Sequence, residues 1–197
     1  MGRWEPGSRG RLEQAALELF DERGFESTTV AAIAERAGLT ERTFFRHFTD
    51  KREVLFWGAG SLQDLLVSSV DAAPATEAPL DAIVAALRAA AEEFFDERGE
   101  HARRRQAVID ANPELQEREI VKMARLAAAL ADALRRRGVG DPTASLAAEA
   151  GITAFRIGFE TWVHDDAEQS LSEAIQATAD ELRLLTGAPG PKTRRRR

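Results

Sequence analysis

Apolar residues recur every three or four positions along most of this chain, the spacing that places them on one face of an α-helix. In the first such segment, residues 9–23, the positions expected to face inward are Leu12, Ala16, Leu19 and Phe20. No segment shows the convincing alternation of apolar and polar residues that is typical of a half-buried strand. The pattern therefore predicts an all-α fold of about nine helices.

Residues 28–47 predict two short helices joined by a tight turn. The inward positions of the first helix are Val30, Ile33, Ala34 and Ala37. Gly38 follows them, where a left-handed turn residue is needed, and Thr40 is of the type that caps the next helix. Phe44 and Phe48 are one helical turn apart and can face the core. This arrangement predicts a helix-turn-helix, whose second helix enters the major groove of DNA.

The outward face of the second short helix carries both charge and an aromatic ring. A solvated polar face is the ordinary explanation for Arg42 and Arg46 on a short helix. Phe45 between them favours a binding face instead, because a bulky apolar residue gains nothing from solvent exposure.

This segment resembles the TetR family of bacterial regulators over about residues 10–60. The pattern that carries the resemblance is Thr-Thr-Val-x-x-Ile-Ala-x-x-Ala-Gly-Leu-Thr-x-x-Thr-Phe-Phe-x-His-Phe-x-x-Lys, with Phe20 and Gly24-Phe25 upstream. The family usually has Tyr where this chain has Phe45, and the Tyr hydroxyl commonly bonds a phosphate. The Phe45 ring cannot make that bond; packing, or contact with a sugar or a thymine methyl group, remains open to it.

The resemblance implies a sequence-specific DNA-binding regulator, most often a ligand-released repressor, with no cofactor and no metal. It implies a homodimer whose two recognition helices read a palindromic operator in double-stranded DNA. The residues expected to contact DNA are Arg9, Arg11, Thr28, Thr29, Thr40, Glu41, Arg42, Thr43, Phe45, Arg46, His47 and Lys51.

Length and charge fit this interpretation once charge is counted by region. The 197 residues suit a DNA-binding domain over 1–52, a ligand-binding and dimerisation domain over 53–187 and a disordered basic tail over 188–197. The net charge of −6 disfavours DNA binding, but residues 1–52 contain nine Lys or Arg and nine Asp or Glu, so the acidic excess lies elsewhere.

Cellular location and redox chemistry follow from what the sequence lacks. The chain has no cysteine, which excludes disulfides and cysteine metal sites. It shows no signal peptide and no apolar run long enough to cross a membrane, so we expect a cytoplasmic protein without a membrane partner.

Start and stop signals divide the rest of the chain into further helices. Asp50-Lys51-Arg52-Glu53 is a capping-box pattern that predicts a fourth helix to about Val70, and Ser170 with Glu173 predicts the same device at the last helix. The helices expected between them cover about residues 80–99, 101–111, 113–137 and 142–164, and the last runs to 187.

The last two helices are the expected dimer interface, since they carry small residues that allow close approach, and TetR relatives dimerise through these helices. The alternative is that the same positions pack within one subunit. The residues expected at the interface are Ala147, Ala150, Gly151, Ala154, Gly158, Leu171, Ala174, Ile175, Thr178 and Leu182.

The middle helices contain more aromatic bulk than a small core needs, which predicts an apolar ligand pocket. Trp57 belongs to this set, and most of its members would still be ordinary core. Arg103-Arg104-Arg105 is either a solvated charge run or an anion clamp at the pocket mouth. The expected pocket residues are Phe56, Phe94, Phe95, Arg103, Arg104, Ile109, Met123, Leu126, Phe155, Phe159 and Trp162.

A finer resemblance concerns the ligand. Arg-Thr-Phe-Phe-Arg-His-Phe, followed by Asn-Pro-Glu-Leu-Gln-Glu-Arg-Glu and an Ala/Leu-rich helix, resembles the branch that includes the mycofactocin-associated regulators. That branch implies an apolar small-molecule effector such as a fatty acyl-coenzyme A. Binding of this effector would displace the fourth helix and change the spacing of the recognition helices.

The sequence also bears on two other classes of protein. A helical enzyme is disfavoured, because His47, His101 and His164 have no metal-ligand partner at helical spacing and no catalytic motif stands out. A DNA-binding regulator without a small ligand stays open, and a well-packed core without a cavity would support it.

Overall fold

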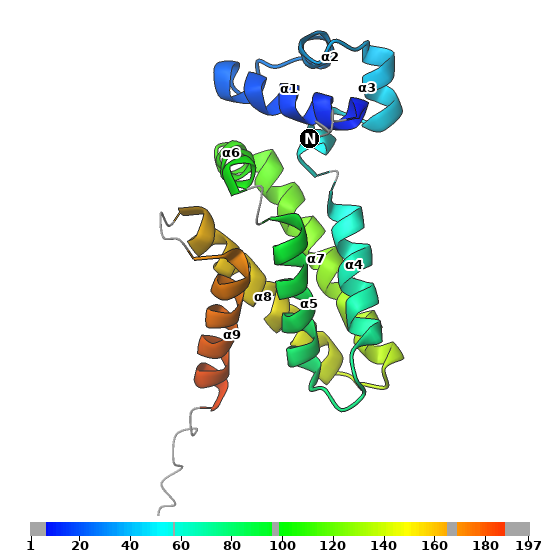
Figure 1. Ribbon diagram of the computed structural model, residues 1–197, viewed down its shortest axis with the longest axis vertical. Helices are drawn as coiled ribbons and strands as arrows, with labels where there is room; N and C mark the ends of the chain where they lie inside the picture. The colour runs from blue at the N-terminus through cyan, green and yellow to red at the C-terminus, as the bar shows by residue number, and fades with distance from the viewer. Residues whose placement is uncertain (1–6, 57, 96–98, 165–168, 188–197) are drawn as a thin grey trace, which may run out of the picture. The chain divides into compact units, whose positions relative to one another are not determined.

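The computed structural model describes residues 7–56, 58–95, 99–164 and 169–187; Trp57 and the basic tail 188–197 lie outside these ranges. The described residues form nine α-helices, one 3-10 helix and no strand, which confirms the all-α prediction (Figure 1). In chain order the elements are α1 (Ser8–Arg23), α2 (Val30–Arg36), α3 (Glu41–His47), η1 (Lys51–Phe56), α4 (Ala59–Ala72), α5 (Pro79–Phe94), α6 (Gly99–Asp110), α7 (Pro113–Arg136), α8 (Thr143–His164) and α9 (Leu171–Gly187).

The chain divides into two compact units. Unit 1 comprises residues 1–62 and 98–123, and unit 2 comprises residues 63–97 and 124–197. The boundary between them falls inside α4, after Leu62, and inside α7, after Met123. The helix-turn-helix therefore folds together with α6 and the first half of α7.

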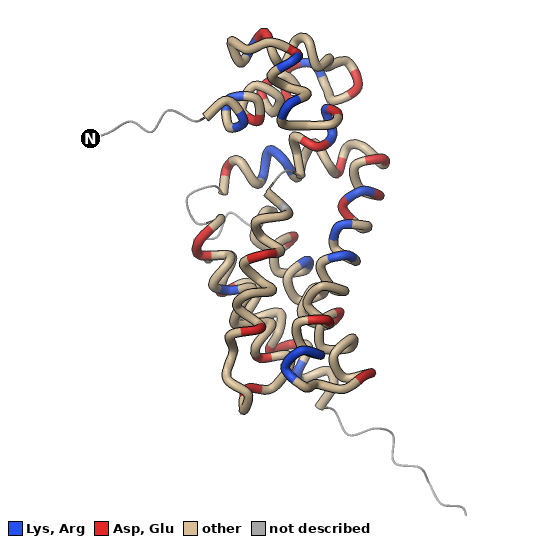
Figure 2. The backbone as a smooth tube through the Cα atoms, turned by 90° about the vertical axis from the view of Figure 1, so that its right-hand side faces the viewer, with Lys and Arg blue, Asp and Glu red and all other residues tan. Residues whose placement is uncertain are grey.

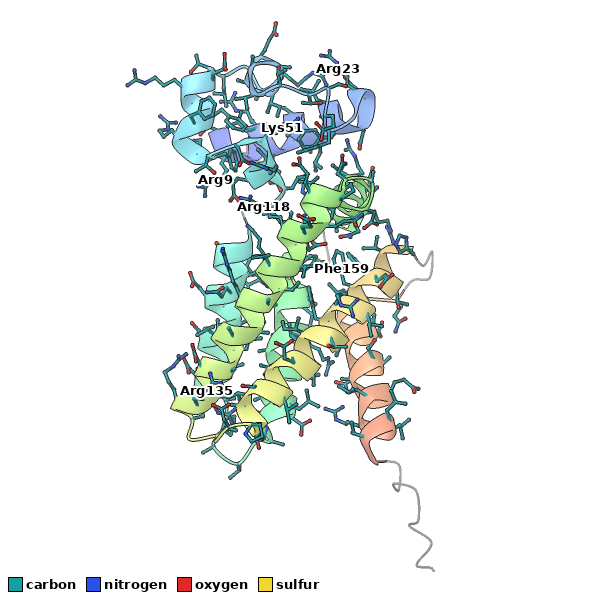
Figure 3. All side chains as sticks on the ribbon, turned by 180° about the vertical axis from the view of Figure 1, so that it is seen from behind. Arg9, Arg23, Lys51, Arg118, Arg135 and Phe159 are labelled. Atoms are coloured by element: carbon teal, nitrogen blue, oxygen red, sulfur yellow. The ribbon has the colours of Figure 1, made fainter. Side chains whose placement is uncertain are left out.

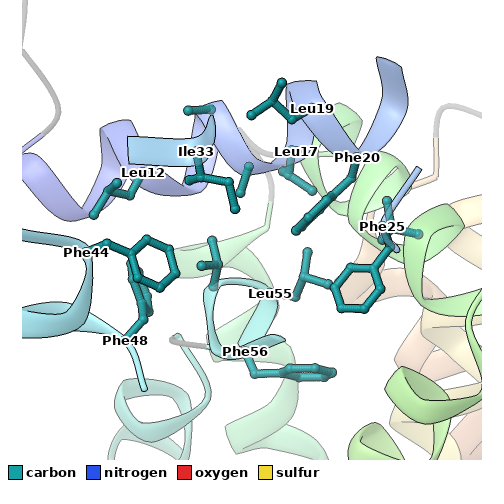
Figure 4. Close-up of a cluster of buried hydrophobic side chains, with 14 of the residues drawn as sticks. Leu12, Leu17, Leu19, Phe20, Phe25, Ile33, Phe44, Phe48, Leu55 and Phe56 are labelled. Atoms are coloured by element: carbon teal, nitrogen blue, oxygen red, sulfur yellow. The ribbon is translucent and has the colours of Figure 1, made fainter. Parts of the chain in front are cut away.

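Unit 1 has its own apolar core, built around α1 (Figure 4). Leu12 of α1, Ile33 of α2 and Phe44 of α3 are fully buried in this core. Ile109 of α6 and Leu115 of α7 belong to the same cluster and are equally buried. Burial of such side chains is the main free-energy gain that fixes the three short N-terminal helices.

Unit 2 is built mainly from the packing of α5, α8 and α9 against one another. Two glycines of α8 permit the close approach. A Cβ atom on Gly151 would lie 2.4 Å from Cγ2 of Ile83 in α5, and one on Gly158 would lie 3.0 Å from the backbone nitrogen of Ile175 in α9. The small residues of α8 thus serve helix packing within one chain.

The predicted fourth helix differs from the structure. Asp50 does act as a cap, because its Oδ1 accepts hydrogen bonds from the amides of Arg52 and Glu53 at 2.8 and 3.1 Å. The turns that follow are a 3-10 helix, η1, and α4 begins only at Ala59. The Glu53 carboxylate contacts Arg118 and Lys122 rather than closing the capping box on Asp50.

Other helix ends depend on local signals. The box predicted at α9 forms completely: the Ser170 amide donates to Glu173 Oε2 at 2.9 Å, and the Glu173 amide donates to Ser170 Oγ at 3.2 Å. By contrast, α5 ends at Phe94, before the expected stop at Gly99, and Gly99 begins α6 instead.

Of the helices that the structure describes, none combines the length and the apolar character needed to cross a membrane.

Candidate nucleic-acid interface

The turn between α2 and α3 is fixed by caps at both helices. Thr29 Oγ1 accepts a hydrogen bond from the Ala32 amide at 3.1 Å, and Thr40 Oγ1 accepts one from the Thr43 amide at 3.2 Å. Gly38 has a φ of 64°, the left-handed conformation expected of the turn residue. These contacts confirm the predicted helix-turn-helix.

The α3 helix buries one face and exposes the other. Phe44 and Phe48 are buried and their ring centroids lie 5.3 Å apart. Phe45, between them, is 55% exposed, and Arg42 and Arg46 are exposed with it. The outward face of α3 therefore combines two guanidinium groups with an uncovered aromatic ring.

His47 joins this surface to the first turn of α1. Its Nε2 lies 2.8 Å from Oγ of Ser8. Burial lowers the pKa of His47 below its ordinary value of 6.5, and the neighbouring charges of Arg46 and Arg9 lower it further. The Arg9 guanidinium carbon is 5.9 Å from the centroid of the Phe48 ring. No local sequence pattern points to Ser8, yet its hydroxyl contacts and positions a residue of the candidate interface.

Lys51, expected to contact DNA, has its ammonium group inside unit 1 (Figure 3). Its Nζ donates to the carbonyls of Phe25, Glu26 and Thr28 at 2.7, 3.2 and 3.2 Å. An ammonium group has three donors, so all three are used within the chain. In this geometry Lys51 holds the connection between α1 and α2.

Two more of the expected DNA contacts have partners within unit 1. Thr28 is 2% exposed, and its hydroxyl donates to the carbonyls of Leu19 and Gly24 at 3.2 and 2.8 Å. Arg11 Nη1 donates to the carbonyl of Ala37 at 3.4 Å, at the end of α2. Thr29, Thr40, Glu41 and Arg42, by contrast, are exposed on or beside α2 and α3.

The arginine run of α6 makes hydrogen bonds within unit 1. Arg104 pairs with Asp21 of α1 at 2.6 Å. Arg105 donates to the carbonyl of Leu55 at 2.6 Å and pairs with Glu119 at 3.1 Å. Arg103 is exposed. Basic and acidic residues are interspersed along the chain, so arginine side chains commonly have a carboxylate nearby with which to form an ion pair (Figure 2).

The predicted pocket residues are divided between the two units. Phe56 and Ile109 are part of the core of unit 1. Arg103, Arg104 and Met123 lie in the same unit but are not buried in that core. The unit 2 members include buried Leu126 and half-buried Phe94.

The other four aromatic residues of the set form one cluster in unit 2. Phe95 lies 6.4, 5.8 and 6.3 Å, between ring centroids, from Phe155, Phe159 and Trp162. Phe159 in turn lies 5.9 Å from Phe155 and 5.8 Å from Trp162. These rings pack on one another in tilted and edge-to-face geometry, which is favourable for aromatic pairs.

Unit 2 also has a surface concavity of about 250 Å³. It is open to solvent and lined largely by small side chains of α4, α5 and their connecting loop, namely Ser69, Ala72, Ala73, Glu77, Ala82, Ala85, Ala86 and Ala89. The predicted aromatic residues do not line this concavity.

The residues predicted at the dimer interface are mostly covered by their own chain. Buried among them are Ala147, Gly151, Ala154, Gly158, Leu171, Ala174 and Ile175, whereas Ala150, Thr178 and Leu182 are half-buried. The exposed large apolar residues of the same two helices are Leu146 and Ile157 in α8 and Leu184 and Leu185 in α9. The helical spacing of these exposed residues can be seen in the sequence. Spacing alone, however, does not distinguish a helix face that the same chain buries from one that is exposed to solvent.

Comparison with known proteins identifies the family. Residues 13–56 match the model of bacterial regulatory proteins of the tetR family, and residues 77–185 match the MftR C-terminal domain. A putative mycofactocin biosynthesis transcriptional regulator, MftR of Mycobacterium tuberculosis, is 31% identical over 189 residues, covering 91% of each chain. The transcriptional regulator TcmR of Streptomyces glaucescens is 42% identical over 82 residues; the match covers 42% of this chain and 36% of TcmR.

Solved structures agree on the fold. A putative TetR-family regulator from Syntrophomonas wolfei superposes with a TM-score of 0.65 at 19% identity, covering 93% of this chain and 97% of that one. Thermus thermophilus FadR, a TetR-family repressor solved in complex with lauroyl-CoA, gives 0.55 at 21% identity, covering 96% and 99%. The matched families and relatives are regulators of transcription and not enzymes. The chain belongs to the TetR family of bacterial transcriptional regulators and has a C-terminal domain of the MftR type.

Proposed function

We propose that this regulator is a ligand-released repressor that binds a palindromic operator as a homodimer. The observation that carries the DNA-binding part is the outward face of α3, where Arg42, Phe45 and Arg46 are exposed while Phe44 anchors the helix in the core. Exposed arginines suit both phosphate contacts and the acceptor edge of guanine in the major groove.

A second copy of the chain is proposed to cover the exposed apolar side chains of α8 and α9. Leu146 and Ile157 are eleven residues apart, which is three helical turns, so they lie on one face of α8. Leu184 and Leu185 are exposed near the end of α9. A two-fold axis would place the same patch of both copies face to face and would match the symmetry of a palindrome.

The proposed effector is an apolar small molecule, with fatty acyl-coenzyme A as the class to test first. The MftR-type domain and the fold shared with lauroyl-CoA-bound FadR support this choice. The ligand would act by population shift: it would bind best to a form of unit 2 in which the paired recognition helices no longer fit the operator. Its effect is limited by its difference in affinity for the two forms.

One observation favours a second candidate, a DNA-binding regulator that needs no small ligand. The Phe95, Phe155, Phe159 and Trp162 rings pack on one another. The concavity of about 250 Å³ in unit 2 is smaller than ordinary ligand pockets, which are roughly 300–1,000 Å³.

The decisive experiment is fluorescence anisotropy of the protein on the intergenic DNA that flanks its own gene, with and without long-chain acyl-coenzyme A. Tight, salt-sensitive binding that the acyl compound releases would support the full proposal. Binding that no acyl compound affects would overturn the effector and favour the second candidate. Arg46→Ala should weaken operator binding at moderate salt; unchanged affinity would mean that the assigned face of α3 is wrong.

A further inference from the structure

We propose that Phe45 is a specificity-determining residue that recognises the 5-methyl group of a thymine in the operator. The inference rests on the proposed DNA-binding function and adds to it the base and the chemical group that α3 reads. It predicts that part of the sequence preference is apolar rather than hydrogen-bonded.

The exposure of Phe45 is unusual within the N-terminal segment that contains the helix-turn-helix. Among the described residues 7–56, it is the large apolar side chain that the fold leaves exposed, at 55%. The other aromatic residues of that segment, Phe20, Phe25, Phe44, Phe48 and Phe56, are all at least 95% buried. An exposed phenyl ring on a functional helix is stabilised when a partner removes it from water.

The Phe45 ring packs edge-on against one buried neighbour, Phe44. Its centroid lies 5.5 Å from that of Phe44, with an interplanar angle of 81°, an edge-to-face contact. Phe44 is itself fully buried and packs on Phe48. An anchored ring loses little conformational entropy on binding, so contact with a small apolar group can be discriminating.

The chemistry of the surrounding face narrows what this ring can recognise. Its exposed neighbours are charged: Arg42 and Arg46 can donate to base edges or phosphates, and Glu41 can accept from a base edge. The phenyl ring has no donor or acceptor. On the floor of the major groove the apolar group is the C5 methyl of thymine, and apolar side chains, Phe among them, contact it.

The test replaces thymine by uracil, which removes the methyl group and leaves every hydrogen-bonding atom unchanged. An operator is first selected from a random duplex library with the full-length protein, and each thymine of a half-site is then replaced in turn. We expect one replacement, repeated in the symmetric half-site, to weaken binding of the unmodified protein about threefold to tenfold per half-site.

The Phe45→Ala variant supplies the matched comparison. Because Phe45 is exposed, the variant should keep its circular dichroism spectrum and melting temperature. It should bind the thymine and uracil operators equally. Arg46→Ala should weaken binding to both operators by the same factor and keep the discrimination.

The outcomes separate this proposal from the function on which it rests. If no sequence is enriched in the selection, the DNA-binding proposal itself fails. If an operator is found but no thymine-to-uracil replacement matters, or Phe45→Ala keeps the discrimination, Phe45 is not the methyl reader. If Phe45 contacts a deoxyribose instead, no thymine-to-uracil replacement will change the affinity, since that contact does not depend on the methyl group.

Discussion

The hydroxyl oxygen of Ser8 lies 2.8 Å from Nε2 of His47, so the first turn of α1 is joined to the last turn of α3. This contact links two helices across 39 positions of the sequence. It orients the imidazole at the end of α3, and the DNA contact that we propose for His47 depends on that orientation.

We expect Ser8→Ala to weaken operator binding about threefold to tenfold, the effect of losing one hydrogen bond that orients a contact residue. Ser8→Thr, which keeps the hydroxyl, is the control. Anisotropy titrations of Ser8→Ala, His47→Gln and the double variant test the coupling. Strictly additive losses would show that Ser8 acts independently of His47.

Measurements on Lys51 variants can distinguish a role in folding from a role in DNA contact. Because all three of its donors bond the carbonyls of Phe25, Glu26 and Thr28, Lys51→Met should lower the free energy of unfolding by about 1–3 kcal/mol. Arg42→Met, at an exposed position of α3, should change that free energy by less than about 0.5 kcal/mol.

The salt dependence of operator binding should show the opposite order of effects for the Lys51→Met and Arg42→Met variants. Arg42→Met should reduce the slope of log affinity against log salt by about one per half-site, and Lys51→Met should leave the slope unchanged. Should Lys51→Met keep its urea unfolding curve and lose salt dependence, Lys51 would be a phosphate ligand after all.

Local contacts of this structure could be predicted from the sequence, whereas contacts between distant positions could not. The capping box of Ser170 and Glu173 was readable because both partners lie within one helical turn. The partners of Lys51 lie 23 to 26 positions upstream, and no local pattern distinguishes a cation that bonds carbonyls from one that bonds phosphate.

Helical spacing likewise identified the fold but not the use of each face. Phe95 and Phe159 belong to the set from which a ligand pocket was predicted, although most of that set was expected to be ordinary core. In the structure their rings pack on each other, with centroids 5.8 Å apart. Bulky residues at helical intervals can either line a ligand pocket or pack in the core. Only the tertiary contacts distinguish these two roles. The role of Gly151 was open for the same reason, since a small residue suits a subunit interface and an internal helix crossing equally well.

Gly151→Ala should destabilise unit 2 by about 1–3 kcal/mol, because the added Cβ would lie 2.4 Å from Cγ2 of the buried Ile83. Gly140→Ala, where nothing lies within 4 Å, is the matched control and should be nearly neutral. Urea unfolding measures both. In an Ile83→Ala background the cost of Gly151→Ala should shrink; an undiminished cost would place the strain elsewhere.

His47 should make folding stability fall on acidification. Burial and the charges of Arg46 and Arg9 hold its pKa below 6.5 in the folded protein, so the unfolded chain binds the proton more readily. The contribution of neutral His47 is therefore complete above pH 6.5 and is lost as pH falls through the lower folded-state pKa. Melting temperatures between pH 7.5 and 5 should drop slightly more in the unmodified protein than in His47→Gln. Equal slopes would mean that the two states share one pKa.

The proposed dimer face can be tested at positions that the chain itself leaves uncovered. Leu146 and Leu184 are 65% and 70% exposed, so Leu146→Glu with Leu184→Glu should leave the fold intact and place charges where two apolar surfaces are expected to meet. Sedimentation velocity should then show a monomer, and operator affinity should fall at least about tenfold, because one recognition helix loses its linked partner.

Ile120→Glu is the control for this pair, since Ile120 is 68% exposed on the part of α7 that belongs to unit 1. That variant should sediment as the unmodified protein does. A double variant that still dimerises would remove Leu146 and Leu184 from the interface. It would leave the half-buried side chains of Ala150, Thr178 and Leu182 as the predicted interface residues that a partner can still reach.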